Sequence, residues 1–384
     1  MKKVAIVVAF LLAGIFIFAT PVCAVGESPT TSADDIYNSQ LENSKAKDLL
    51  DELPGDAQKE LDNLKVSKPD WRQLNSLSFM DIFTSIMRMI GEQSITPLNS
   101  MSKVLAIILL CALLESFKTT FSSGPLGGAL GVVSTICICG IIIYPISNTI
   151  AMGAAVVNSS ASFMFMYIPI MVGLMVSCGQ PVTGASYYSM MMGASTVVSQ
   201  IASKILVPLL NVFLGISVVG AVSPKINLSG VCSLISKVVK WVLTFIMSIF
   251  VTMLTMQTII GTSADSTGVR AARFAISSFV PLVGGALSEA FQTVQGCMRL
   301  LKSGVGVFAI LGTAVMYLPA VIQCLLWLIT INLCAAAGDV FGLSVPCTLL
   351  RASGKVLSTM LAILLCCMVI FIISTTIVVS IGGG

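Results

Sequence analysis

Long hydrophobic runs separated by short polar ones fill the chain after about residue 100. A membrane-spanning helix needs about 20 apolar residues, and shorter or interrupted runs fit segments that enter the bilayer without crossing it. Two of the runs, 187–203 and 274–290, are rich in Ser, Gly and Thr and are the weaker candidates for a crossing. The pattern predicts an all-α polytopic membrane protein with about eight membrane segments, within a range of roughly seven to ten. The candidate segments are 103–117, 129–151, 161–178, 187–203, 205–222, 240–261, 274–290, 303–317, 318–338 and 357–380.

Composition supports the membrane assignment. Hydrophobic residues make up 56% of the 384 residues and charged residues 10%. The mean hydropathy is +0.98. Soluble domains carry about 25% charged residues, so this composition is that of an integral membrane protein.

The first residues have the layout of a secretory signal. Two lysines precede an apolar core, and Val22 and Ala24 supply small residues at the −3 and −1 positions of a cleavage site. We therefore expect a signal peptide over residues 1–24. An uncleaved membrane anchor is the alternative, and a lipoprotein signal at Cys23 is weaker because Val22 directly precedes the cysteine.

Charge is distributed unevenly along the chain. Between Glu27 and Arg72 there are eleven acidic and six basic residues, whereas from Met101 onward there are four acidic and twelve basic ones. We expect an exported, acidic and partly helical head over residues 25–99, with an amphipathic helix at about 40–53, followed by a polytopic membrane domain over residues 100–384.

Basic loops of membrane proteins tend to lie in the cytosol. An exported head places Lys118 inside, and counting all ten segments as crossings places a further set of basic residues inside too. Arg270 and Arg273 then fall outside, which suggests that the chain bends near them. The inner set is Lys225, Lys237, Lys240, Arg299, Lys302, Arg351 and Lys355.

The membrane domain contains an internal similarity at an offset of about 110 residues. The stretch from Tyr167 to Gly173 aligns with Phe279 to Gly285, and Pro208 aligns with Pro319. We interpret this as a repeat with units at 129–222 and 240–338. Parallel halves follow from an even number of crossings per unit, and inverted halves follow if one segment is re-entrant.

Ionisable residues in apolar surroundings single out Gly261–Gly306. Charged groups at membrane depth are costly unless they face a partner or a wet cavity, so they mark functional positions. The alternative is that they lie at the interface and reach water. Asp265 precedes Arg270 by five residues, a spacing that does not favour a direct pair along a helix. The candidate pathway or subunit-contact residues are Asp265, Arg270, Arg273 and Glu289.

Two prolines extend this candidate set. Pro169 and Pro281 occupy matching positions in Gly-containing apolar segments. Proline removes a backbone donor, and paired interrupted segments in repeated halves point to a transport pathway. Close helix packing through small residues explains the same composition equally well.

Several chemistries are excluded. The chain has no histidine, which removes His-based metal sites and Ser-His or Cys-His nucleophiles. Most of the twelve cysteines lie in apolar runs without metal-binding spacing. No phosphate-binding loop is present. We therefore expect no enzyme activity, no cofactor, no metal and no nucleic-acid partner.

The polar block carries a resemblance to a known family. GTSADSTGVRAARFAISSFVPLVGGALSEA, followed by GCMRLLKSGVGVF, resembles the most recognisable block of stage III sporulation protein AE, a polytopic membrane protein of endospore-forming bacteria. PLNSMSKVLAIILLCALLESFKTTFSS and YIPIMVGLM extend the similarity upstream.

The resemblance implies a non-enzymatic subunit of a channel between mother cell and forespore. It implies a place in the mother-cell membrane around the forespore, a role in late forespore gene expression, and membrane lipid and other sporulation proteins as partners. Those proteins are the other stage III A-operon proteins and stage II sporulation protein Q. A stand-alone secondary transporter built from the repeat is the alternative.

Overall fold

The computed structural model describes residues 37–42, 44–66, 68–70, 73–74, 77–121, 126–201, 204–205, 207–222, 229–279 and 284–380. The regular elements in these ranges are helices, as the hydrophobic pattern predicts. The expected signal peptide and Pro281 lie outside the described residues, so both remain predictions.

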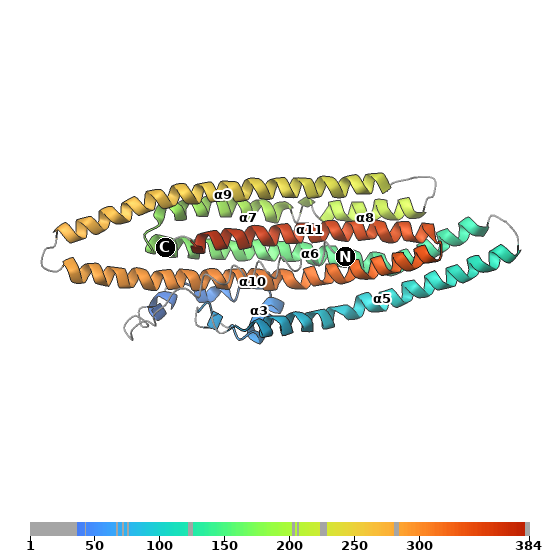
Figure 1. The fold of residues 1–384 in the computed structure, drawn as a ribbon, viewed down its shortest axis with the longest axis horizontal. Helices are drawn as coiled ribbons and strands as arrows, with labels where there is room; N and C mark the ends of the chain where they lie inside the picture. Colours follow the sequence, from blue (N-terminus) through green and yellow to red (C-terminus); the bar gives the residue numbers. More distant parts are fainter. Residues whose placement is uncertain are drawn as a thin grey trace.

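The chain forms an elongated helical bundle with a small head on one side (Figure 1). The head contains η2 (Ala46–Leu49) and α3 (Gly55–Asn63). The chain runs back and forth along the bundle, so α5–α6, α8–α9 and α10–α11 connect at one end and α6–α7 and α9–α10 connect at the other (Figure 1). The bundle helices are α5 (Phe79–Phe121), α6 (Leu126–Ser177), α7 (Pro181–Ile201), α8 (Val207–Val222), α9 (Ser229–Phe279), α10 (Gly284–Val340) and α11 (Ser344–Ser380).

Five of the described helices are long and apolar enough to cross a membrane, which supports the membrane assignment. A sixth, shorter apolar helix covers Pro208–Gly220. The five candidate spans are Met80–Leu114, Val132–Ser177, Ser233–Gly268, Thr293–Val340 and Ser344–Ser380.

Several boundaries differ from the expected ones because helices continue through them. The expected segments 129–151 and 161–178 are one helix, α6, which passes through Pro169 without a break. Segments 303–317 and 318–338 are likewise joined in α10, around Pro319. Neighbouring helices and local adjustment can accommodate a proline inside an apolar helix. The expected segment 274–290 instead comprises the end of α9 and the start of α10.

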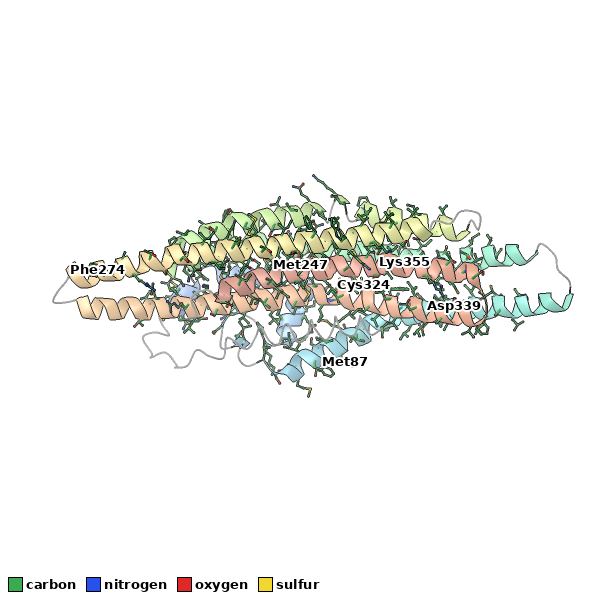
Figure 2. All side chains as sticks on the ribbon, turned by 45° about the horizontal axis from the view of Figure 1, so that its top comes forward. Met87, Met247, Phe274, Cys324, Asp339 and Lys355 are labelled. Carbon is green, nitrogen blue, oxygen red and sulfur yellow. The ribbon has the colours of Figure 1, made fainter. Side chains whose placement is uncertain are left out.

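The continuity of α10 also separates basic residues that the expected topology had grouped on one side. Arg299 and Lys302 lie near the start of α10, and Asp339 lies near its end. At about 1.5 Å per residue, Lys302 and Asp339 are about 55 Å apart along the helix. Figure 2 shows Asp339 and Lys355 toward the α10–α11 end and Phe274 at the α9–α10 end. Arg299 and Lys302 therefore lie at the opposite end of the bundle from Lys355.

The helix layout gives the predicted repeat little support. Pro208 is the second residue of α8, whereas Pro319 lies in the interior of α10. Pro169 lies inside α6, and its expected counterpart is outside the described residues. The repeat therefore remains a prediction from the sequence.

The head packs against the middle of the bundle. Leu53 is buried. A Cβ added at Gly312 would lie 3.5 Å from the Leu53 side chain and 3.7 Å from Phe163, so α10, α6 and the head meet at one point. Arg88 of α5 contacts both carboxylate oxygens of Glu60 in α3 at 2.7 Å, which ties the start of α5 to the head.

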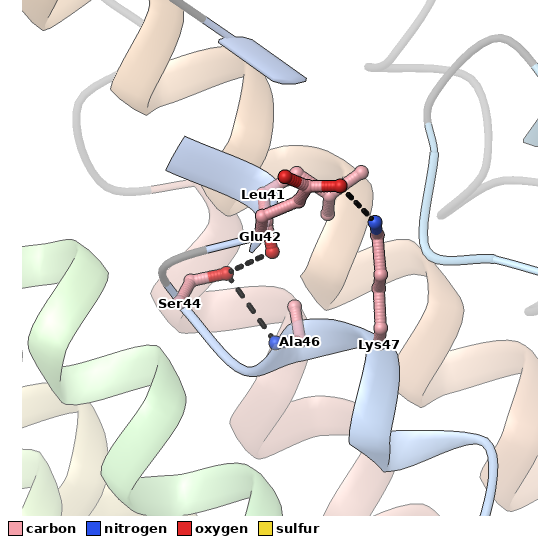
Figure 3. A network of polar contacts seen from close by, with 5 residues as sticks. All are labelled: Leu41, Glu42, Ser44, Ala46 and Lys47. Carbon is pink, nitrogen blue, oxygen red and sulfur yellow. Dashed lines mark hydrogen bonds and ion pairs between the residues drawn. The ribbon is translucent and has the colours of Figure 1, made fainter. Parts of the chain in front are cut away.

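The expected helix at 40–53 is interrupted. Residues 37–42 are helical, and η2 begins at Ala46. Between them the Ser44 hydroxyl donates to the Leu41 carbonyl at 3.0 Å and accepts from the Ala46 N–H at 3.3 Å (Figure 3). Serine competes for backbone groups in this way and favours turns over continuous helix. A hydrogen bond from Lys47, reinforced by its charge, lowers the pKa of Glu42 beside this turn.

Replacing Arg88 by Gln should loosen the head. The substitution removes the ion pair to Glu60, and because Arg88 is half-exposed we expect a cost of about 1 kcal/mol, equivalent to about fivefold faster proteolytic cleavage of the head. Limited proteolysis of the purified protein measures this rate. Lys59→Gln, at an exposed position of the same helix α3, is the control. Equal rates for the two variants would contradict the docking role of the pair.

Candidate functional site

The polar block lies at the α9–α10 end of the bundle, beside the turn between α6 and α7. Asp265 comes from α9, Lys302 from α10, and Gln180 from the turn itself. Asp265 is 5% exposed and Lys302 is 2% exposed. Two buried ionisable side chains from different helices thus converge on one short connection.

The turn closes α6 through a glycine. Gly179 has φ 81°, a conformation that glycine adopts without strain. The N–H of Gly179 donates to the Val176 carbonyl and that of Gln180 donates to the Met175 carbonyl, both at 2.9 Å. These are the two bonds of a Schellman motif, which satisfies the last carbonyls of a helix. The chain can therefore reverse within three residues.

Asp265 caps the helix that follows the turn. Its carboxylate accepts hydrogen bonds from the Val182 N–H at 2.9 Å, the Thr183 N–H at 2.9 Å and the Thr183 hydroxyl at 2.6 Å. Pro181 has no N–H to satisfy, and the Gly184 N–H bonds to the Gln180 carbonyl at 3.0 Å. One carboxylate therefore completes the start of α7, where the helix dipole also favours negative charge.

Gly261 allows α9 to approach α7 this closely. It lies one helical turn before Asp265 and is buried. A Cβ at this position would lie 2.7 Å from the Thr183 hydroxyl oxygen and 2.9 Å from the Thr183 Cα. Because any larger residue would collide with the α7 backbone, Gly261 and Asp265 act together in fixing the contact between the two helices.

Lys302 holds the other side of the turn. Its ammonium donates to the Gln180 side-chain oxygen at 3.0 Å. Gln180 immediately precedes α7, so α10 and α9 each contribute one charged side chain to the start of the same helix. The arrangement links four helices, namely α6, α7, α9 and α10.

Two of the remaining candidate residues, Arg270 and Pro169, are described and lie outside this cluster. Arg270 lies on α9 and is exposed, and Pro169 is an exposed residue inside α6. The side chains of Arg273 and Glu289 are outside the described part of the structure. The ion pairs between described side chains are Lys47–Glu42, Arg88–Glu60 and Arg351–Asp339, and the hydrogen bonds of Asp265 in the described part of the chain come from α7.

A local pattern marks the residues of this turn, which were not among the candidates. Gly179, Gln180 and Pro181 form a Gly-x-Pro stretch, which is typical of a helix end followed by a helix start. Thr183 follows at the position where a capping hydrogen bond is needed. The partner from a distant helix could not be inferred from this spacing.

Asp265 and Lys302 hold the start of α7 against the neighbouring helices, and we call this arrangement the clamp. Within the described ranges, no group of three His, Cys, Asp or Glu side chains could hold a metal ion. Each oxygen of the Asp265 carboxylate accepts at least one hydrogen bond from α7. A group engaged in this way acts by positioning helices.

The family model for stage III sporulation protein AE matches residues 69–382. The chain belongs to this family. The match includes the whole bundle and the clamp between α7 and α9. The helices of the bundle therefore give a view of a stage III sporulation protein AE fold.

A curated relative gives the same assignment at greater distance. Stage III sporulation protein AE of Bacillus subtilis (strain 168) is 20% identical over 213 residues, which is 56% of this chain and 53% of the relative. The similarity thus spans about half the length of that relative. No solved structure matches the chain.

Removing the Asp265 cap should destabilise the bundle. Asp265→Ala leaves the Val182 and Thr183 N–H groups without their acceptor, at a cost of about 1–3 kcal/mol each. Asp265→Asn retains one acceptor oxygen and should cost about 1–2 kcal/mol. Thermal unfolding in detergent should therefore give Tm values in the order wild type, Asn, Ala. Asp339→Asn removes an exposed ion pair and should change little. A decrease in Tm for Asp339→Asn as large as that for Asp265→Asn would contradict the capping role of Asp265.

Gly261→Ala should separate α9 from α7. Relieving the overlap with Thr183 requires the helices to move, at a cost of about 1–3 kcal/mol. Gly268→Ala lies on the same helix with nothing within 4 Å of the added Cβ. Its better helix propensity should stabilise by about 0.5–1 kcal/mol. We therefore expect Gly261→Ala to lower the Tm and Gly268→Ala to raise it. Equal changes in Tm would show that α9 and α7 are loosely packed at Gly261.

Proposed function

We propose that the protein is a non-enzymatic membrane subunit of a sporulation-specific channel that connects mother cell and forespore. Family membership supports the sporulation role, and the five long apolar helices support the membrane location. The proposal places the protein in the mother-cell membrane around the forespore, with an exported head. Its partners would be the other stage III A-operon proteins and stage II sporulation protein Q.

The observation that favours a channel subunit is the difference between two sides of the bundle. The α9 side carries a long exposed apolar face that includes Phe245, Ile249 and Ile260. On the opposite side the head lies along α10 (Figure 1). Lipid suits the first side, whereas charged head residues such as Lys47 and Glu42 require water or protein.

The depth of the head makes this difference informative. Gly312, which lies against Leu53, and Phe163 beside it are both inside candidate membrane spans. Phe163 is 14 residues before Ser177, the last residue of α6, or about 21 Å along the helix from its end. Charged groups at such a depth are tolerated when they face a wet cavity or a partner. A subunit lining a channel or contacting other subunits on its α10 side provides this environment.

The lengths of α6 and α10 exceed the thickness of a single bilayer. Helix α6 has 52 residues and α10 has 57. At about 1.5 Å per residue they are about 78 and 86 Å long, against about 30 Å for the hydrocarbon layer. More than half of each helix therefore extends beyond that layer if the helices stay straight. Such extensions suit contacts between subunits outside the membrane.

Alanine substitutions at the candidate residues test the proposal in sporulating cells that carry this gene. Arg270 is exposed, so Arg270→Ala should block spore formation after engulfment at normal protein abundance. The same outcome is expected for Arg273→Ala and Glu289→Ala if they form subunit contacts. Asp265→Ala should instead lower abundance, because it removes the α7 cap. Spore counts and membrane immunoblots measure the two effects.

Ser266→Ala is the matched control, since Ser266 is exposed and its hydroxyl donates to the Ser263 carbonyl of the same helix. Normal sporulation with Arg270→Ala, Arg273→Ala and Glu289→Ala would show that the polar block, Gly261–Gly306, is not a contact surface between subunits. Affinity purification from the same cells separates the channel subunit from a stand-alone transporter. Recovery of other sporulation membrane proteins supports the subunit, and solute uptake by the purified protein alone supports the transporter.

A further inference from the structure

A groove runs between α9 and α11 on the outside of the bundle. Its volume is about 390 Å³, within the range of about 300–1,000 Å³ typical of small-molecule sites. Apart from one lysine and one threonine the lining is apolar. The residues that line it are Lys240, Leu243, Thr244, Met247, Ala362, Leu365, Cys366 and Val369.

The lysine lies at one end of this groove. Lys240 is half-buried, and its ammonium donates to the Ser358 hydroxyl of α11 at 3.0 Å. One turn earlier, the hydroxyls of Ser236 and Thr359 are 2.8 Å apart, so the two helices are pinned together beside the groove. The apolar lining continues from Lys240 toward Met247, about 10 Å along α9 at about 1.5 Å per residue.

Two further lysines lie at the same end. Lys237 on α9 and Lys355 on α11 are both exposed. Arg351 is paired with Asp339, whereas the ion pairs of the described residues include none of these three lysines. The end of the groove is therefore a concentration of positive charge without a carboxylate partner in the described part of the chain.

The level of these lysines matches a membrane boundary. Trp241 is exposed and stacks on Phe245 with ring centroids 5.6 Å apart. Tryptophan is enriched where the hydrocarbon meets the headgroups. From Trp241 to Ala264 the helix has no charged residue, a length of about 36 Å at about 1.5 Å per residue, which covers a hydrocarbon layer of about 30 Å. The lysines thus lie at the headgroup level and the groove at the acyl-chain level.

We propose that this groove binds an anionic phospholipid, with one acyl chain along Leu243, Met247 and Leu365 and the phosphate at Lys240. Lys237 and Lys355 add to the attraction for the headgroup. Basic sites between membrane helices recognise acidic lipid headgroups in this way. A lipid fits better than a free phosphate, because the apolar lining needs a chain, and the proposal does not depend on the channel function.

Native mass spectrometry of the purified protein tests the site. Samples come from nanodiscs of phosphatidylglycerol or of phosphatidylcholine with identical acyl chains. The wild type should retain one phosphatidylglycerol that withstands activation, in preference to phosphatidylcholine. Lys240→Gln removes the charge and leaves a polar side chain at the end of the groove, and retention should fall about fivefold, as expected for one lysine near an anionic surface. Lys103→Gln, an exposed lysine on α5, should retain lipid as the wild type does.

A second variant separates the groove from general surface charge. Ala362→Phe fills the groove and leaves the three lysines in place, so retention should fall while the Tm remains near that of the wild type. Equal retention of both lipids, or full retention in Ala362→Phe, would overturn the proposal. Displacement of the bound lipid by glycerol phosphate alone would also overturn it, because it would indicate a headgroup site without a chain.

Discussion

The bundle depends on the hydrogen bonds that Asp265 accepts at the start of α7. A helix that begins at a buried position must satisfy its first N–H groups within the protein, because water does not reach them there. The sequence meets this demand with Pro181, which has no N–H, and with a carboxylate from another helix that accepts from Val182 and Thr183. The turn at Gly179, the close approach at Gly261 and the contact of Lys302 with Gln180 all meet at this helix start.

The spacing of charged residues also limits which parts of the bundle can lie at membrane depth. Lys240 and Asp265 bound the uncharged part of α9, and Lys355 begins an uncharged stretch in α11 that extends to its end. Because the two stretches lie side by side, the lysines form one level and the clamp at α7 forms another. The groove between α9 and α11 opens between these levels. The head contacts α10 at a depth between the same two levels, on the side away from α9. At this depth the bundle therefore faces the head on one side and presents the exposed apolar face of α9 on the other.

The helical class and the membrane location could be predicted from hydrophobic periodicity, and the family from a short polar block. Helix boundaries could not, because Pro169 and Pro319 are strong breakers locally but are accommodated by packing in α6 and α10. For the same reason Arg299 and Lys302 lie at the opposite end of the bundle from Lys355, whereas the basic-loop pattern had grouped the three on one side. Asp265 was identifiable as an unusual residue, but its acceptor role depends on Thr183, 82 residues earlier, which no local pattern reveals.

The cap also determines what the rest of the polar block can do. Successive residues of an α-helix turn by about 100°, so Arg270, five residues after Asp265, faces about 140° away from it. Holding Asp265 against α7 therefore turns Arg270 outward, and Arg270 is exposed. A single rotation of α9 would bury the arginine and expose the carboxylate. The buried charge thus fixes the rotation of α9 about its own axis, and with it which residues of the polar block are exposed at this end of the bundle.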